Sequence, residues 1–235
     1  SVTTASPLSS VARDFDHDGD LDVAVLTANG VVVLYDQLGP GTFGLQPSGM
    51  FGGPSVLPAP VGIHGSDVNG DGRVDLLVVQ SDRVSVFHQD ASGNYGALPD
   101  IEVGIGSTAL SSVVMSDLDT DGDQDLILVD PGAHRLAVHL QTGAGFVGPA
   151  DQLLGGPATT NGLIDIDIAD LDGDGDLDLV GACSTGNTIA VFLQIGGGAF
   201  PIVPDGTHGG VGATDGPRRV HAVDLDHDGH VDLLC

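Results

Sequence analysis

The chain has 235 residues, of which 41% are hydrophobic, and it carries a formal net charge of −27 with no Lys and only six Arg. Such an acidic surface repels nucleic acid and anionic lipid headgroups, so we expect no nucleic-acid partner. No apolar run approaches the roughly 18 residues of a membrane span, so we expect no membrane insertion. Length and hydrophobic content suffice for a single domain, residues 1–235, with a substantial core.

An acidic segment of nine residues recurs five times along the chain. Positions 1, 3, 5 and 9 are Asp in every copy, except that Asn69 stands once at position 3, and position 6 is always Gly. The copies begin at Asp14, Asp67, Asp117, Asp170 and Asp224, which are 53, 50, 53 and 54 residues apart. A period near 50 residues is typical of a propeller or a solenoid.

The spacing of these acidic side chains predicts one Ca²⁺ site in each copy. Closely spaced carboxylates repel one another unless a cation lies between them, and oxygen ligands favour Ca²⁺, which takes about six to eight of them. Gly at position 6 lets the chain turn sharply around the ion. Position 7 is Asp, Arg, Asp, Asp and His in turn, so we expect its backbone carbonyl, rather than its side chain, to bind.

Up to five Ca²⁺ ions are therefore expected, one in each loop. The predicted ligands are Asp14, Asp16, Asp18, Asp20 and Asp22 in the first loop; Asp67, Asn69, Asp71, Arg73 and Asp75 in the second; Asp117, Asp119, Asp121, Asp123 and Asp125 in the third; Asp170, Asp172, Asp174, Asp176 and Asp178 in the fourth; and Asp224, Asp226, Asp228, His230 and Asp232 in the fifth.

The first six positions also match an EF-hand loop, which needs a bidentate Glu at position 12 and flanking helices. Position 12 is here Val25, Val78, Leu128, Gly181 and Cys235, and these residues lie in short apolar runs. The pattern therefore excludes an EF-hand.

The same order of short apolar segments accompanies each loop. One segment leads into the loop, at 10–13, 61–66, 109–116, 163–169 and 220–223, and another follows it, at 21–27, 74–80, 125–129, 177–182 and 231–234. After a turn, a third segment lies at 31–37, 84–89, 136–141 and 189–194. These runs are too short for helices and rich in Val, Leu and Ile, so each predicts a strand.

Four strands in a unit of about 50 residues make a propeller blade, the fourth strand here being the variable Gly/Pro stretch that ends each unit. The predicted fold is all-β, a β-propeller of four-stranded antiparallel blades with four complete blades plus half of a fifth. The expected repeats cover about 9–60, 61–108, 109–162, 163–217 and 218–235. One aromatic in a Gly-rich turn of each complete unit is expected to pack between repeats: Phe43, Tyr95, Phe146 and Phe200.

The acidic loop between the first two strands, with a later G-x-F-G-like turn, resembles the FG-GAP/VCBS repeat family. This family includes the Ca²⁺-binding blades of integrin α-subunit propellers and many bacterial surface proteins. The resemblance implies a propeller with ions on one rim, each holding the hairpin between strands one and two. The FG and GAP elements are degenerate here, because only Phe43-Gly44 and Tyr95-Gly96 approximate the first and Gly53-Pro54 the second.

The fifth repeat stops at Cys235, after its second strand, whereas propellers of this family commonly have seven blades. An open sheet edge exposes unpaired backbone groups and invites pairing with another chain. We therefore expect either that the chain is part of a longer protein or that another copy completes the ring.

The sequence was also searched for catalytic, zinc and thiol chemistry beyond Ca²⁺ binding. Nine histidines show no zinc spacing, and no catalytic residue or further cofactor is expected. Asp165 and Asp167 share one face of a strand, where a polar channel lining and an acid–base pair are both open readings. Cys183 and Cys235 are compatible with a disulfide or with two separate thiols.

Three functions fit these features. The first is a non-catalytic, Ca²⁺-stabilised scaffold for adhesion, protein–protein interaction or assembly, with a protein or glycan partner at the cell surface. The second is a carbohydrate-binding propeller, and the third is the propeller appendage of a secreted enzyme. An extracellular or cell-surface location is expected because millimolar Ca²⁺ outside cells would fill weak sites, and because the chain begins at Ser1 rather than Met it is expected to be a processed protein or a fragment.

Overall fold

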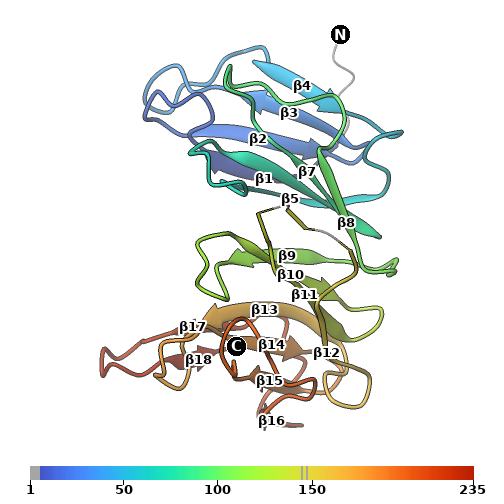
Figure 1. Ribbon diagram of the computed structural model, residues 1–235, viewed down its shortest axis with the longest axis vertical. Coiled ribbons are helices and arrows are strands. Elements are labelled where there is room, and N and C mark those ends of the chain that lie inside the picture. Colours follow the sequence, from blue (N-terminus) through green and yellow to red (C-terminus); the bar gives the residue numbers. More distant parts are fainter. Residues whose placement is uncertain (1–5, 144, 147) are drawn as a thin grey trace. The chain divides into compact units, whose positions relative to one another are not determined.

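The computed structural model describes residues 6–143, 145–146 and 148–235, and within these ranges it contains strands, turns and loops but no helix. The described part of the chain therefore has no helix that could cross a membrane. Eighteen strands form four four-stranded sheets and one two-stranded sheet (Figure 1).

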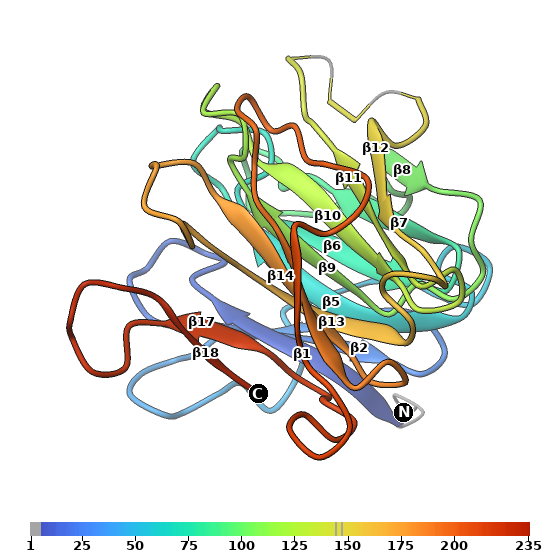
Figure 2. The same ribbon diagram turned by 90° about the horizontal axis from the view of Figure 1, so that it is seen from below.

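Each sheet is an antiparallel meander whose strands follow one another in chain order. The first sheet contains β1 (Pro7–Arg13), β2 (Asp22–Thr27), β3 (Val31–Tyr35) and β4 (Gly49–Gly52), and the second contains β5 (Pro60–Ser66), β6 (Asp75–Gln80), β7 (Arg83–Phe87) and β8 (Ile101–Gly104). The third contains β9 (Ser112–Ser116), β10 (Asp125–Asp130), β11 (Arg135–His139) and β12 (Gln152–Gly155), and the fourth contains β13 (Leu163–Ala169), β14 (Asp178–Cys183), β15 (Thr188–Phe192) and β16 (Gly206–Gly209). The fifth is the hairpin of β17 (His221–Val223) and β18 (Asp232–Leu234) (Figure 2). This confirms the all-β prediction of four complete propeller-type blades and half of a fifth.

The strands form where the sequence offers apolar and β-branched runs. In the second, third and fourth sheets the second strand is buried along its whole length, because both of its faces are covered. Strands covered on both faces are apolar at consecutive positions, as in the Leu126–Val129 run of β10.

The chain forms two compact units, Ser1–Thr108 and Ala109–Cys235. In the first unit β1 lies against β5, and side chains of both sheets share a core that includes Phe15, Leu26, Leu76 and Phe87. In the second unit β13 lies against β10 and against β17. Each unit therefore buries the facing surfaces of consecutive sheets, as propeller blades do.

The aromatics of the Gly-rich turns behave as predicted in two repeats. Tyr95 stacks on Phe51 of the first sheet with ring centroids 5.3 Å apart, and it meets the edge of Phe15 at 6.5 Å. Phe200 is buried in a core with Leu136 and Leu154 of the preceding sheet. These contacts confirm inter-repeat packing for both rings, whereas Phe43 of the first repeat is 40% exposed.

A threonine holds the turn that follows the fourth strand in two repeats. Gly156 N–H donates to Thr160 Oγ1 at 2.8 Å, and this hydroxyl donates to the carbonyl of His134. Thr214 makes the equivalent bonds with Gly210 and Asn187. The preceding glycines, Gly155 and Gly209, have φ values of +84° and +96°, in the left-handed region that favours glycine.

Replacing Gly155 by Ala is expected to destabilise the second unit. A Cβ atom there would lie 2.2 Å from Thr160 Oγ1 and 3.0 Å from its Cγ2, so rotation of the threonine would not relieve the overlap. Left-handed strain and overpacking together predict a loss of about 2–4 kcal/mol, measured by urea unfolding.

Gly143→Ala is the control, because a Cβ there has no neighbour within 4 Å among the described residues. Equal unfolding midpoints for the two variants would contradict the role assigned to the Gly155–Thr160 contact.

Candidate metal centres

Each acidic loop connects the first two strands of its sheet and is closed by the strand ladder. Position 9 is the first residue of the second strand, and it pairs with the residue that precedes position 1; in the first sheet these residues are Asp22 and Arg13. The same closure is seen in the other sheets at Asp75, Asp125, Asp178 and Asp232. The loop is therefore a hairpin connection with a fixed start and end.

Backbone N–H groups orient the carboxylates in the same way in all five loops. The position-6 glycine donates to Oδ2 of position 1 at 2.8–3.1 Å. Position 5 donates to the side-chain Oδ1 of position 3 at 3.0–3.3 Å. Position 7 donates to Oδ1 of position 5 at 2.9–3.0 Å. These bonds hold the acidic side chains over a tight turn rather than leaving them to point freely into solvent.

The turn needs left-handed backbone at two positions. The position-6 glycines have φ values of 84–97°, as the sequence analysis expected for a sharp turn. Position 4 is also left-handed, with φ values of 61–81°, although it is His17, Thr120 and His227 in three loops and glycine in two. The two histidines therefore lie at a turn position and outside the predicted ligand set.

The carboxylate at position 9 has a second function, which the sequence analysis did not assign. In the four complete sheets this Asp is at most 1% exposed. Its Oδ2 accepts the N–H of position 2 at 2.8–3.0 Å. Its Oδ1 accepts, at 2.7–2.8 Å, the N–H of a Gln that follows the third strand: Gln37, Gln89, Gln141 and Gln194. The recurrence of this Gln was the signal in the sequence that could have revealed the contact.

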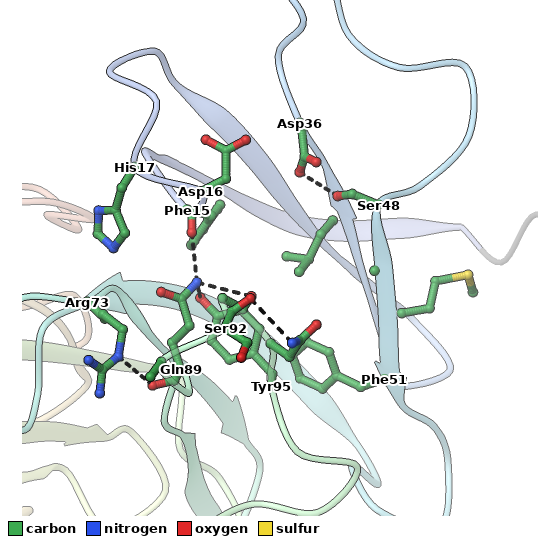
Figure 3. A pocket seen from close by; sticks show the side chains of 16 residues that line it. Phe15, Asp16, His17, Asp36, Ser48, Phe51, Arg73, Gln89, Ser92 and Tyr95 are labelled. Carbon is green, nitrogen blue, oxygen red and sulfur yellow. Dashed lines mark hydrogen bonds between the residues drawn. The ribbon is translucent and has the colours of Figure 1, made fainter.

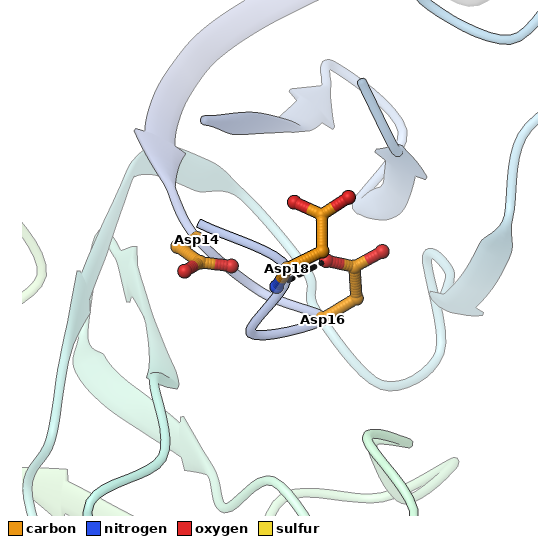
Figure 4. A group of neighbouring side chains, drawn as sticks. All are labelled: Asp14, Asp16 and Asp18. Carbon is orange, nitrogen blue, oxygen red and sulfur yellow. Dashed lines mark hydrogen bonds between the residues drawn. The ribbon is translucent and has the colours of Figure 1, made fainter. Parts of the chain in front are cut away.

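Four of the loops bring three carboxylates together. One oxygen from each member lies within 4.8 Å of the others in these groups: Asp14, Asp16 and Asp18; Asp117, Asp119 and Asp125; Asp170, Asp172 and Asp178; Asp224, Asp226 and Asp232. Figure 4 shows the first group on its loop. Ligands of one Ca²⁺ ion, each about 2.3–2.6 Å from the metal, are separated by at most about 5 Å, so these spacings fit a shared cation.

The first loop also contains buried oxygens that lack a partner. Oδ1 of Asp14 and Oδ1 of Asp20 are inaccessible to solvent and accept no hydrogen bond. A buried carboxylate oxygen without a donor is costly, and a cation would satisfy it. The oxygen ligands that the loop offers, and these two unpartnered oxygens, fit a hard cation. The side chain of Asp20 is therefore an additional candidate metal ligand. The individual ligand assignments stay predictions.

Burial makes the ionised form of several loop carboxylates less favourable than it is in water. It raises the pKa of Asp75, Asp125 and Asp178, and the two backbone N–H donors offset this only in part. Burial, followed by the charge of Asp121, also raises the pKa of Asp119. A bound cation would favour the charged forms of such groups.

The second loop differs from the others. Asn69 replaces the position-3 carboxylate, and no group of three neighbouring acidic side chains is found in this loop, all of which the structure describes. Arg73 at position 7 forms an ion pair with Asp71 at position 5.

Asp165 and Asp167 of β13 join two sheets. Their Oδ2 atoms accept the N–H groups of Val220 at 3.0 Å and Ala222 at 2.9 Å, so the side chains bridge β13 and the chain at β17. These bonds give the pair a structural function, which the sequence analysis missed because it depends on a strand about 55 residues away.

The two cysteines are free thiols, Cys183 buried and Cys235 exposed. Cys183 is buried, and burial raises the pKa of its thiol to about 11, so it is protonated and unreactive at neutral pH.

The fold and the loops define the class: an all-β protein of propeller-type blades, each with an acidic turn between its first two strands. The family model for the FG-GAP-like repeat matches residues 67–128, 117–181 and 170–235, and the chain belongs to this family. Membership confirms the resemblance and supports a non-catalytic scaffold or binding role.

Two solved structures share the propeller-type fold of this chain. A lectin from Agrocybe aegerita, described as recognising non-reducing terminal N-acetylglucosamine, matches with a TM-score of 0.62 and 18% identity over 95% of this chain and 60% of the lectin. BBS1N, solved in complex with ARL6DN, matches with a TM-score of 0.56 and 12% identity over 90% of this chain and 58% of BBS1N. At these identities the likeness shows the fold alone, and the chain spans about three fifths of either structure. No curated protein matches this chain.

Asp178→Ala is expected to destabilise the protein even when a chelator removes all divalent cations. The change leaves the N–H groups of Leu171 and Gln194 without their acceptor, which predicts a loss of about 2–4 kcal/mol in urea unfolding. Asp176→Ala is the matched control, because no hydrogen bond to its carboxylate is present in this fully described loop, and a change below about 0.5 kcal/mol is expected. Similar losses for both variants would show that the position-9 hydrogen bonds are unimportant.

Proposed function

We propose that this chain is a Ca²⁺-stabilised, non-catalytic binding scaffold that acts outside the cell or at its surface, in adhesion, protein–protein interaction or assembly. The observation that carries the proposal is the recurrence of one loop geometry in five repeats, with three close carboxylates in four of them. Membership of the FG-GAP-like repeat family supports a scaffold that binds and does not catalyse.

Ca²⁺ fits these loops better than Mg²⁺ or Zn²⁺. Zn²⁺ prefers nitrogen and sulfur ligands, whereas the loops offer carboxylate, amide and carbonyl oxygens. Mg²⁺ demands near-octahedral geometry and retains several waters, whereas Ca²⁺ accepts many oxygens in flexible geometry. The loops are largely exposed, which suits the weak sites of extracellular modules that fill at about 10⁻⁴–10⁻³ M Ca²⁺. This chemistry supports the proposed location.

The partner class is a protein or a glycan. Two of the structural neighbours are described with one of each, a protein complex for BBS1N and N-acetylglucosamine for the lectin. Another copy of the chain, or the remainder of a longer chain, is a further partner that would complete the propeller.

Removing Ca²⁺ is expected to lower the melting temperature by about 5–10 °C or more, because an ion bound only by the folded state stabilises it at each site. Differential scanning calorimetry in EDTA, in 2 mM Ca²⁺ and in 2 mM Mg²⁺ measures this shift, with Ca²⁺ restoring the higher value more fully than Mg²⁺. In Ca²⁺, Asp174→Ala should reduce the melting temperature more than Asp176→Ala, whose side chain we place outside the ligand set. Identical melts in EDTA and Ca²⁺ would refute calcium stabilisation.

A cavity in the first unit favours a second candidate function, the binding of a glycan or another polyhydroxyl ligand. The cavity measures about 550 Å³ and lies between the first acidic loop, the β3–β4 hairpin and the turn after β7. Its lining combines Asp16, Asp36, Arg73 and Asn94 with the stacked rings of Phe51 and Tyr95 (Figure 3). Polar donors and acceptors beside an aromatic surface are the groups that orient a sugar in a pocket.

Screening the Ca²⁺-loaded protein on a glycan array tests this candidate, followed by calorimetry with the best ligand. Asp36→Ala should weaken binding by about tenfold, since a lost hydrogen bond to a charged group is worth about 1.5–3 kcal/mol. Asp215→Ala, an exposed change in the other unit, should leave binding unchanged. An array without hits from folded, Ca²⁺-loaded protein would eliminate the glycan function and leave the scaffold proposal standing.

A further inference from the structure

We infer that the second acidic loop carries its own cation, the guanidinium group of Arg73, and therefore binds Ca²⁺ more weakly than the other four loops. This inference rests on the proposed function, Ca²⁺ binding by the loops. The repeated motif alone would predict equal Ca²⁺ affinity for all five loops, whereas this inference gives the second loop a lower affinity than the other four.

Arg73 engages the position-5 carboxylate of its own loop. Its Nη2 atom donates to Asp71 Oδ2, while its backbone N–H donates to Asp71 Oδ1 at 3.0 Å. Both oxygens of this carboxylate therefore already have donors. The two side chains are about one quarter to one third exposed, at 26% for Asp71 and 30% for Arg73.

The other four loops offer a freer carboxylate at the same position. In each, Oδ1 of position 5 accepts the N–H of position 7, as in the second loop: Asp18, Asp121, Asp174 and Asp228. Across the residues that the structure describes, Oδ2 of Asp18, Asp174 and Asp228 accepts no protein hydrogen bond, and Asp121 forms no ion pair with a basic side chain. Position 7 is Asp or His in these loops, so no permanent positive charge stands there.

A second contact holds the guanidinium in place. Arg73 Nε donates to the backbone carbonyl of Gln89 at 2.9 Å (Figure 3). Gln89 is the residue whose N–H donates to the buried position-9 carboxylate, Asp75. Arg73 therefore bridges the loop and the end of the third strand, instead of extending into solvent as an isolated arginine would.

The charge balance of the second loop points the same way. At positions 1, 3, 5 and 9 the second loop has three carboxylates instead of four, because Asn69 stands at position 3. Arg73 adds a positive charge beside one of these three, the carboxylate of Asp71. Ligand charge is one of the two properties that set the affinity of oxygen sites for Ca²⁺. A guanidinium close to the ion position repels Ca²⁺ while supplying the attraction that keeps the loop closed without it.

Counting Ca²⁺ sites by isothermal titration at low ionic strength tests the inference. The wild-type chain should show four tighter sites and one at least tenfold weaker. Arg73→Ala should strengthen the weak site about tenfold. Arg83→Ala, which removes a half-buried arginine paired with Asp82 and Glu102 outside the acidic loops, should change nothing.

The reciprocal variant, Asp123→Arg, transfers the arginine to the third loop and should weaken one of the four tight sites. It keeps the test decisive if Arg73→Ala fails to fold. Five equivalent sites in the wild type, unaffected by either variant, would overturn the inference while leaving Ca²⁺ binding intact. A chain that binds no Ca²⁺ at all would overturn the proposed function and this inference together, so the two failures are distinguishable.

Discussion

The buried carboxylate at position 9 of the acidic loop, in each of the four complete sheets, is the interaction on which the rest of the structure depends. The second strand of each of these sheets begins with this residue: Asp22, Asp75, Asp125 and Asp178. Its carboxylate accepts one N–H from the start of the loop and another from the end of the third strand. One side chain thereby fixes three segments. An anion at this depth is unfavourable by itself, and two charge-assisted hydrogen bonds, together with any cation held by the same loop, compensate for its burial.

The loops also connect cation binding to the packing between repeats, because neighbouring positions point in opposite directions. Phe15, at position 2 of the first loop, is buried in the core that the first two sheets share, and its carbonyl accepts a hydrogen bond from Gln89 Nε2 of the next repeat at 2.8 Å. Leu118 at the same position in the third loop lies in a core with Phe192 and Phe200 of the fourth repeat. Ordering a loop around an ion therefore also orders the apolar residue on which the next sheet packs.

The sequence was sufficient to predict the strand order and the loops, because both depend on residue types at fixed local spacing. The predicted third strands each extend two residues too far at their C-terminal ends, to Gln37, Gln89, Gln141 and Gln194 instead of Tyr35, Phe87, His139 and Phe192. The backbone leaves the ladder there so that each Gln N–H can reach the position-9 carboxylate. The hydrogen bond from Thr160 to His134 and the one from Val220 to Asp165 were not predicted. Their partners are 26 and 55 residues apart in the sequence, and such distant pairs leave no periodic signal.

The distribution of charge explains why such a fold benefits from metal. Most of the acidic residues lie in the five loops, and within one loop the carboxylates are much closer together than the Debye length of about 8–10 Å at ordinary ionic strength, so salt screens them poorly. Only six arginines oppose a net charge of −27, and one of them, Arg73, lies inside a loop. Five divalent ions would bring the net charge to about −17 and act where repulsion is greatest. Repulsion within the loops and the absence of Lys thus act together: apart from Arg73 in the second loop, no Arg or Lys lies within the nine-residue loops, and bound cations are the remaining source of permanent positive charge there.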